Sequence, residues 1–317
     1  MHCLSVVIPT YNRKDTLRKA LQAYRKQSPA QQVAEVLVID DGSTDGTGAA
    51  VLECAEESPI PIRYLSQVHK GPAAARNLGI RESPTELVLL TDDDIIPADD
   101  LVAQHMSWHR THPAPFVAVL GYVTWSAVIG ATPFMRWYSE DGPLFGFRHL
   151  AGQTEVDFAR FFTCNLSLKR DYLINNGMFD EDFKSAAWED FELGYRLHKR
   201  GMKLLFNRSA IAYHHQFFSF ADARRRAQRV AEARRVLQRK EAGTYLSDLE
   251  RRQRLTDPHR LPQWSTRIME RALASLEPLL DSRIPLPAAI YRKLHARCAS
   301  LAESMYAPLG TIENEGE

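Results

Sequence analysis

The sequence has few cysteines, and they follow no pattern. The four cysteines of the 317-residue chain are Cys3, Cys54, Cys164 and Cys298, and no two form a Cys-x-x-Cys pair. This spacing excludes a zinc ribbon or a disulfide framework as the basis of the fold. A chain of this length can bury a sizeable core without crosslinks. Because the scattered cysteines indicate no disulfides, we expect a protein of a reducing compartment.

Net charge is also nearly absent. The chain has 40 lysines and arginines against 39 aspartates and glutamates, which gives a net charge of +1. Proteins that coat nucleic acid are usually far more basic, so we expect no nucleic-acid partner. The 44% hydrophobic and 25% charged residues are typical of a globular protein and argue against disorder.

Long apolar runs are rare. Residues 116–135 contain twenty residues without a charge, a length that could span a bilayer, but glycines, hydroxyl residues and Pro133 interrupt them. A strand followed by an apolar loop is the favoured interpretation, and a membrane span is the alternative. The start of the chain lacks a basic segment and its apolar run stops at Pro9, which predicts no signal peptide. We therefore expect a cytoplasmic location.

Short apolar runs alternate with helical patterns through the first third of the chain. This order predicts an α/β fold with a Rossmann-like, mostly parallel sheet flanked by helices. The predicted strands are 4–8, 35–39, 62–65 and 87–90, and the predicted helices are 15–24, 47–57 and 73–80.

The second half of the chain changes in character near residue 220. Residues 162–168 and 204–213 are predicted strands and 188–199 a predicted helix, whereas 221–241 form an arginine-rich helical segment. From residue 261 the pattern is helical, with expected breaks at Pro278, Pro285 and Pro287. The sequence thus predicts a main domain over 1–220 and a helical C-terminal extension over 221–317.

Acidic and polar residues follow three predicted strands: Thr10 and Asn12, Asp40 and Asp41, and Asp92 to Asp94. Because ligands bind beyond the carboxyl ends of parallel strands, we expect these clusters to meet at one edge of the sheet. Three adjacent carboxylates repel one another, and Mg²⁺ or Mn²⁺ would relieve that repulsion. Asp92 and Asp94 should share a face. The alternative is a solvated turn or helix cap.

A third acidic group begins the helix predicted at 188–199. Asp190 lies on the same helix face as Leu193 and Leu197, so its carboxylate points toward the covered side. The helix dipole favours its ionised form, and a positioned carboxylate can serve as a general base. The alternative is simple helix capping. Glu189 is expected to orient neighbouring groups or face solvent.

Basic residues supply three weaker signals. At most one of His214 and His215, which end a predicted strand, could complete a metal site with carboxylates. Lys70 or Arg76, beside the Gly71-Pro72 turn, could hold a diphosphate at a helix start. The basic 221–241 helix could bind an anionic membrane surface or an anionic acceptor, or be a solvated helix.

The ordered series of motifs resembles the family-two glycosyltransferases with the A-type nucleotide-sugar fold. The resemblance covers roughly residues 4–215. The matching segments are Ser5-Val-Val-Ile-Pro-Thr-Tyr-Asn12, Val38-Ile-Asp-Asp-Gly-Ser-Thr-Asp45, Gly71-Pro-Ala-Ala-Ala-Arg-Asn77, Thr91-Asp-Asp-Asp94, Asn165-Leu-Ser-Leu-Lys-Arg170, Gly177-Met-Phe-Asp-Glu181 and Glu189-Asp190.

The resemblance implies a role for each matching residue. Asp190 would be the catalytic base, with Glu189, Lys70 and Trp188 as supporting residues. Mn²⁺ or Mg²⁺ would be bound by Asp94, Asp92 and His214, although which two of the three aspartates act, and whether His215 replaces His214, stays open. The donor-binding residues would be Pro9, Thr10, Tyr11, Asn12, Asp40, Arg76, Asp92 and Asp93.

The implied reaction is an inverting transfer of a sugar from a nucleoside-diphosphate sugar, with UDP as the expected nucleotide, to an acceptor hydroxyl. The acceptor would be a saccharide, a lipid-linked molecule or a small molecule, and the 221–241 helix is a candidate contact to the inner face of the membrane. One alternative is a sugar-phosphate nucleotidyltransferase, which should have a glycine-rich loop where this chain has Pro-Thr-Tyr-Asn-Arg-Lys. Another is a non-catalytic module that binds anionic surfaces.

Overall fold

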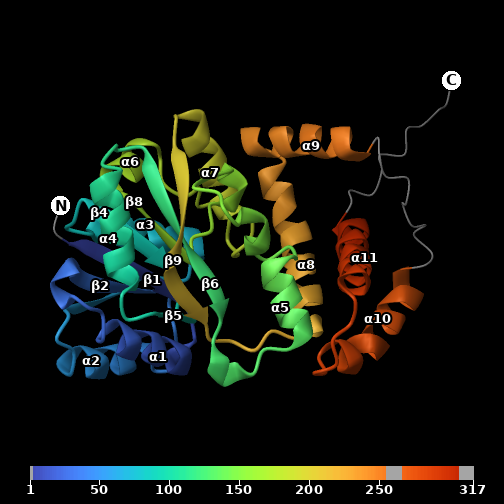
Figure 1. The fold of residues 1–317 in the computed structure, drawn as a ribbon, viewed down its shortest axis with the longest axis horizontal. Coiled ribbons are helices and arrows are strands. Elements are labelled where there is room, and N and C mark those ends of the chain that lie inside the picture. The colour runs from blue at the N-terminus through green and yellow to red at the C-terminus, as the bar shows by residue number, and fades with distance from the viewer. Residues whose placement is uncertain (1–2, 255–265, 307–317) are drawn as a thin grey trace.

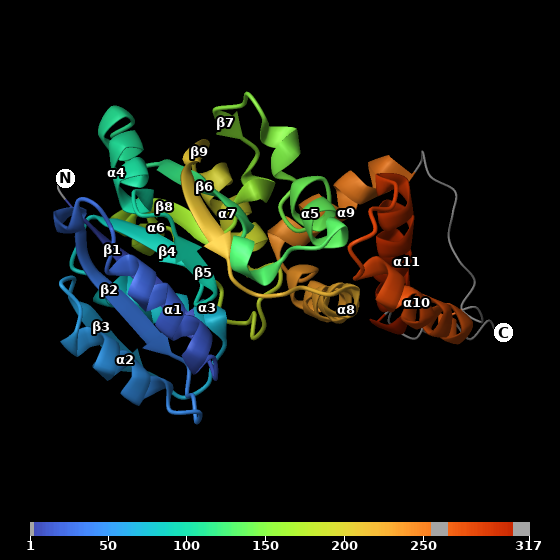
Figure 2. The same ribbon diagram turned by 60° about the horizontal axis from the view of Figure 1, so that its bottom comes forward.

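The computed structural model describes residues 3–254 and 266–306. Their fold is built around a nine-stranded sheet with helices packed against it (Figures 1 and 2). The strand order is β3-β2-β1-β4-β8-β6-β9-β5, and β7 pairs with β9 beside this path. The strands are β1 (Leu4–Thr10), β2 (Val33–Asp40), β3 (Ile62–Ser66), β4 (Leu87–Thr91), β5 (Ile95–Pro97), β6 (Val117–Trp125), β7 (Glu155–Val156), β8 (Asn165–Lys169) and β9 (Lys203–His214).

The first half of the sheet is parallel, as predicted. β1 lies between β2 and β4 and runs parallel to both, and β3 runs parallel to β2. Every residue of β1 is buried, as expected for a parallel strand covered on both faces by helices. These strands are connected by α1 (Lys14–Tyr24), α2 (Thr47–Glu56) and α3 (Pro72–Glu82). The predicted α/β class is confirmed.

The second half of the sheet is mixed. β8 runs antiparallel to both β4 and β6, whereas β6 and β9 are parallel to each other. The remaining helices of this half are α4 (Leu101–Thr111), α6 (Arg170–Asn175) and α7 (Glu189–Lys199). Because β1, β2 and β4 are parallel neighbours, their carboxyl ends lie at one edge of the sheet. That edge positions the candidate site.

The apolar stretch 116–135 contains β6, a 3₁₀ turn and the start of α5 (Pro133–Glu140). The predicted strand is confirmed, but the predicted loop ends in a helix. Thr132 begins α5 by accepting a hydrogen bond from the backbone N–H of Met135 at 3.2 Å. Among the described residues, no helix combines the length and the apolar character needed to cross a membrane.

The C-terminal part contains α8 (Phe220–Leu237), α9 (Glu241–Arg254), α10 (Thr266–Leu280) and α11 (Ala288–Tyr306). The predicted 221–241 helix therefore ends early, at Leu237. Pro278 lies inside α10 instead of breaking it, whereas Pro285 and Pro287 fall between α10 and α11.

A second apolar cluster joins these helices to α5, and its buried members include Phe134, Tyr138, Phe220, Leu273 and Tyr291. Figures 1 and 2 both show α10 and α11 at the end of the molecule opposite the first strands. The division at residue 220 remains a prediction.

Candidate active site

Polar side chains from neighbouring strand ends meet at one edge of the sheet, as predicted. Thr10 and Asp40 are paired residues at the ends of β1 and β2. The Thr10 hydroxyl donates a hydrogen bond to Oδ2 of Asp93, just beyond β4, at 2.8 Å. Asp40 is buried and accepts hydrogen bonds from the Ser43 backbone N–H at 2.8 Å and from the Tyr64 hydroxyl at 2.7 Å. Both oxygens of Asp40 are therefore held in place, which leaves each with one lone pair for a ligand.

Arg13 is a residue of this edge that the sequence analysis missed. Its guanidinium lies 3.1 Å from Oδ1 of Asp93 and 2.8 Å from Oδ2 of Asp94. The repulsion for which we expected a metal ion is thus partly relieved by the protein itself. Arg13 directly follows the Pro-Thr-Tyr-Asn segment at the end of β1, so its position along the chain was the available signal.

The pKa values of the neighbouring carboxyl groups of Asp93 and Asp94 are shifted in opposite directions. Burial raises the pKa of Asp93 to about 7, although Arg13 opposes that rise. Burial also acts against ionisation of Asp94, but His214 and Arg13 outweigh it and lower the pKa of Asp94 well below its usual range. Nε2 of His214 lies 3.3 Å from Oδ2 of Asp94. Asp94 is therefore the ionised carboxylate that faces the histidine.

The predicted metal ligands Asp92, Asp94 and His214 are not grouped in one cluster, and their role in metal binding stays a prediction. β4 ends at Thr91, so the alternation expected to place Asp92 and Asp94 on one face stops before it reaches them. Asp92 accepts a hydrogen bond from Arg76 at 2.8 Å instead. In the described part of the chain, no three His, Cys, Asp or Glu side chains are grouped as a metal site.

The two adjacent histidines have different surroundings. His214 faces Asp94, and its buried Nδ1 has no hydrogen-bond partner among the described residues. The ring of His215 lies 3.2 Å from the Ser126 hydroxyl and 3.3 Å from Nζ of Lys19, while its backbone N–H donates to the Asp94 carbonyl. The geometry therefore favours His214 over His215 as a ligand.

Arg76 is buried between two carboxylates. Its guanidinium contacts Oδ1 of Asp92 at 2.8 Å and Oε1 of Glu189 at 3.1 Å. Burial alone would lower the pKa of Arg76, but the two carboxylates outweigh it and raise it. Burial and the charge of Asp190 raise the pKa of Glu189 to about 8, against the effect of Arg76. Glu189 thus orients Arg76 and does not face solvent.

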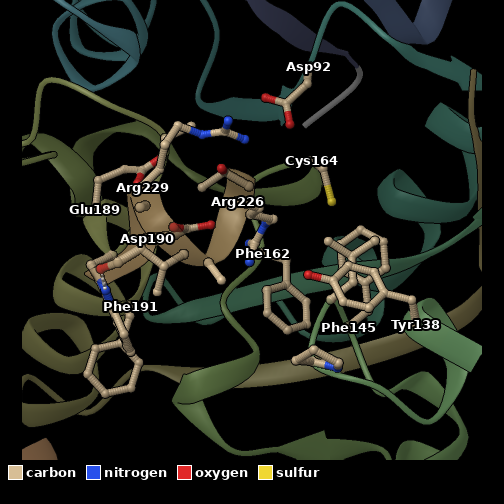
Figure 3. A pocket seen from close by; sticks show the side chains of 18 of the residues that line it. Asp92, Tyr138, Phe145, Phe162, Cys164, Glu189, Asp190, Phe191, Arg226 and Arg229 are labelled. Carbon is tan, nitrogen blue, oxygen red and sulfur yellow. Dashed lines mark hydrogen bonds between the residues drawn. The ribbon is translucent and has the colours of Figure 1, made fainter. Parts of the chain in front are cut away.

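A cavity of about 700 Å³ lies next to this ion-pair network (Figure 3). Its lining comes from α3, α7 and β9, from the segments just after β4 and just before β8, and from α5, α8 and α11. The predicted site residues in its lining are Arg76, Asp92, Trp188, Glu189, Asp190 and His214. The predicted residues outside its lining are Pro9, Thr10, Tyr11, Asn12, Asp40, Lys70, Asp93 and Asp94.

Asp190 lies at the start of α7 and lines the cavity. Trp188, the cap of this helix, has a φ of 71°, a left-handed conformation that is uncommon for a bulky residue and is often found at functional sites. Burial raises the pKa of Asp190, while Arg76 and the Thr163 backbone N–H oppose that rise. A carboxylate of raised pKa is a stronger base and suits proton abstraction near neutral pH.

The residues predicted to hold the nucleoside lie along β1 and the loops beside it. Tyr11 is 44% exposed and stacks on His69 with ring centroids 4.2 Å apart. Asn12, with a φ of 52°, accepts a hydrogen bond from the Thr44 backbone N–H at 2.8 Å. Pro9 is buried within β1 opposite Ile39. These contacts fix the loop that follows Asp40.

Lys70 contributes its backbone to this edge. Its N–H and that of Gly71 donate to the Asp41 carboxylate, both at 2.8 Å, while its side chain is exposed. Gly71 has a φ of +95°, and a Cβ there would lie 2.6 Å from the Lys184 carbonyl oxygen. Only glycine fits this position, which holds the loop before α3 against the segment that leads to α7.

The other side of the cavity contains residues to which the sequence analysis assigned no specific contact. Tyr138 and Phe145 line the cavity, whereas Phe134 lies in the second apolar cluster. Arg226 and Arg229 of α8 also line the cavity. Their role depends on how α8 folds back onto α7, which local patterns do not indicate.

Solved structures with a similar fold share this arrangement of strands and helices. A mannosyltransferase from Pyrobaculum calidifontis in complex with GDP-Man and Mn²⁺ superposes with a TM-score of 0.61 at 22% identity, covering 95% of this chain and 86% of that one. S. aureus TarS 1–349 in complex with UDP has a TM-score of 0.54 at 18% identity, covering 96% and 91%. At such identities the likeness shows the fold alone.

Curated relatives are similar in sequence over about two thirds of the chain. Validoxylamine A glucosyltransferase of Streptomyces hygroscopicus subsp. limoneus is 34% identical over 230 residues, which is 65% of this chain and 50% of that protein. Chondroitin synthase of Escherichia coli is 30% identical over 242 residues, 67% of this chain and 34% of that protein. The chain thus spans about half the length, or less, of these relatives.

A family model also matches the chain, over a shorter stretch than these relatives do. Residues 5–165, slightly more than half of the chain, match the family model for glycosyl transferase family 2. This match includes the motifs at residues 5–12, 38–45, 71–77 and 91–94 and confirms the predicted family. The chain therefore belongs to glycosyl transferase family 2.

Proposed function

We propose that this glycosyltransferase moves a sugar from a nucleoside-diphosphate sugar to an acceptor hydroxyl with inversion, and that Asp190 is the general base. The observation that supports the proposal is a single cavity of about 700 Å³ whose lining contains Asp190, Arg76, Asp92 and His214. The fold neighbours, bound to GDP-Man or UDP, support a nucleotide-linked donor. UDP sugars are the first donors to test.

The donor would lie along the edge formed by β1, β2 and β4. Asp40 and Asn12 would contact the nucleoside, and Arg76 would lie close to the diphosphate. Asp94 and His214 would hold Mn²⁺ or Mg²⁺, because Nε2 of His214 faces the ionised carboxylate of Asp94 and the two offer donor atoms that suit such a cation. When bound, the metal neutralises charge on the departing diphosphate.

The reaction would be a single displacement. Asp190 accepts the proton of the acceptor hydroxyl as that oxygen forms a bond to the anomeric carbon. The bond from the anomeric carbon to the diphosphate oxygen breaks at the same time, and the nucleoside diphosphate leaves with the electron pair. Attack comes from the face opposite the leaving group, so Asp190 and the acceptor lie on one side of the sugar and the diphosphate on the other.

A donor screen tests the proposed reaction. Release of nucleoside diphosphate is measured from a panel of UDP and GDP sugars, with and without Mn²⁺, in the presence of hydroxyl-bearing acceptors. We expect release from at least one donor with inversion of the anomeric configuration, read by NMR of the product. Product with retained configuration would refute the single displacement.

The variant Asp190→Asn tests the base. Turnover is expected to fall by about 10²–10⁴-fold, the typical contribution of general-base catalysis. The nucleotide Kd, measured by titration calorimetry, should stay within about twofold, because the amide keeps the size of the side chain. Asp171→Asn, which changes an aspartate exposed on α6 away from the cavity, is the matched control. Loss of nucleotide binding in parallel with turnover would contradict the role of Asp190 as the base.

A further inference from the structure

Two arginines of α8 form part of the cavity wall. Arg226 and Arg229 lie in its lining together with Asp190, and Figure 3 shows their side chains at the same hollow. They are three residues apart on α8 and therefore lie on one face of the helix. This helix belongs to the C-terminal part of the chain, beyond the residues that match the family.

The charge of this pair is compensated less than that of its neighbours on α8: the carboxylate of Asp222 acts on Arg229 from beyond ion-pair distance, and Arg226 is hydrogen-bonded to Tyr138. Within residues 3–254 and 266–306, neither Arg226 nor Arg229 forms an ion pair with an acidic side chain, although Arg224 pairs with Glu277 and Arg225 with Asp222 on the same helix. Burial and the charges of Arg226 and Arg225 lower the pKa of Arg229. Two neighbouring guanidinium groups that face a cavity would be stabilised by an anion between them.

The position of the pair places it on the acceptor side of the cavity. The Trp188 indole N–H donates to the carbonyl oxygen of Val230 at 2.9 Å. Val230 directly follows Arg229, and Trp188 is two residues before Asp190. The arginine pair is thus tied to the segment that holds the proposed base, whereas His214 ends β9 and Asp92 directly follows β4.

We propose that Arg226 and Arg229 bind an oxyanion, a phosphate or carboxylate group, on the acceptor. The proposal rests on the function proposed above, since the base and the acceptor share one side of the sugar. Guanidinium groups bind both kinds of oxyanion through paired N–H donors. Tyr138, Phe145 and Phe162 line the same cavity and offer apolar surface to the uncharged part of the acceptor.

The first experiment is a binding measurement that does not depend on turnover. Inorganic phosphate is titrated into the full chain saturated with UDP or GDP, and the nucleotides are titrated separately. The double variant Arg226→Gln/Arg229→Gln is compared with Arg110→Gln/Arg239→Gln, which removes the same charge at two exposed residues outside the cavity lining. Circular dichroism and thermal melting check that both variants fold.

We expect the Kd for phosphate to rise at least about tenfold in Arg226→Gln/Arg229→Gln, the effect of losing a charged hydrogen-bond donor. It should stay within about twofold in the control variant, and the nucleotide Kd should be unchanged in both. Unchanged phosphate binding would overturn the proposal. Equal loss of nucleotide binding would also overturn it, because the pair would then serve the donor diphosphate.

The second experiment separates this proposal from the proposed function. Rates are compared for neutral saccharides and their phosphorylated counterparts as acceptors. A preference for the phosphorylated member that disappears in Arg226→Gln/Arg229→Gln supports the proposal, and equal rates with both members in the unmodified protein overturn it. If no donor is turned over, the proposed function fails while the phosphate titration still decides this inference. Dependence of phosphatidylglycerol vesicle binding on the pair, with no phosphate binding, would instead assign it to a membrane surface.

Discussion

Replacing Arg76 with methionine is expected to destabilise the protein through the charges that it leaves behind. Arg76 is 3% exposed and contacts both Asp92 and Glu189. Methionine keeps much of the apolar stem and removes the guanidinium. Glu189 is 2% exposed, and its Oε2 has no hydrogen-bond partner among the described residues, so the substitution leaves a buried carboxyl group without its counter-charge.

Removing one partner of a buried ion pair typically costs about 3–5 kcal/mol. We expect the low end of that range, about 3 kcal/mol, for two reasons. The Asp92 side chain is 33% exposed and can be hydrated. Glu189 can take up a proton, since its pKa is already raised to about 8.

The assay is chemical denaturation followed by tryptophan fluorescence. Arg63→Met is the matched control, because Arg63 pairs with Glu35 at 3.2 Å but is 40% exposed. An exposed pair contributes at most about 1 kcal/mol. Adding Glu189→Gln to Arg76→Met should recover part of the loss, because a neutral amide has no charge to desolvate.

The pH dependence has a definite sign. The folded-state pKa of Glu189 is raised above its unfolded value of about 4.3, so burying this carboxyl group costs nothing below that value and progressively more as pH rises toward the folded pKa. The difference between Arg76→Met and the unmodified protein should therefore shrink on acidification. Equal stability losses in Arg76→Met and Arg63→Met, or an added loss from Glu189→Gln, would refute this reasoning.

Two further predictions concern acid stability and the metal. Burial lowers the pKa of His105 to about 4 and that of His109 to about 3. Because the unfolded histidines titrate near 6.5, the free energy of unfolding should fall between about pH 6.5 and 4 by up to about 1.4 kcal/mol per pH unit for each histidine. Denaturation curves of His109→Gln should show half of the pair's contribution to this pH dependence, and an unchanged slope would contradict the prediction. His214→Ala should raise the Mn²⁺ concentration for half-maximal activity at least about tenfold, because His214 and not His215 faces Asp94; His215→Ala is the control, and equal effects of the two variants would contradict the assignment.

Sequence alone determined the elements whose cause is local. Leu4–Thr10 and Leu87–Thr91 are apolar runs short enough to be strands, and the helix at Pro72–Glu82 begins at a Gly-Pro turn. The order of these elements was enough to predict that Thr10, Asp40 and the three aspartates meet at one edge, since parallel strands leave their carboxyl ends together. The motif series likewise indicated the family before any contact was known.

Only the tertiary structure decided how charges are paired at that edge. Arg13 forms ion pairs with Asp93 and Asp94, and Arg76 forms one with Asp92. Side chains beyond the end of a strand no longer alternate between two faces, so their partners can come from distant segments of the chain. The same reason explains the cavity: Arg226 and Arg229 reach it because α8 packs on α5 and α11 through the second apolar cluster and is hydrogen-bonded to Trp188. A helical period fixes which face of α8 the arginines share, but the partner of that face is set by contacts between residues far apart in the chain.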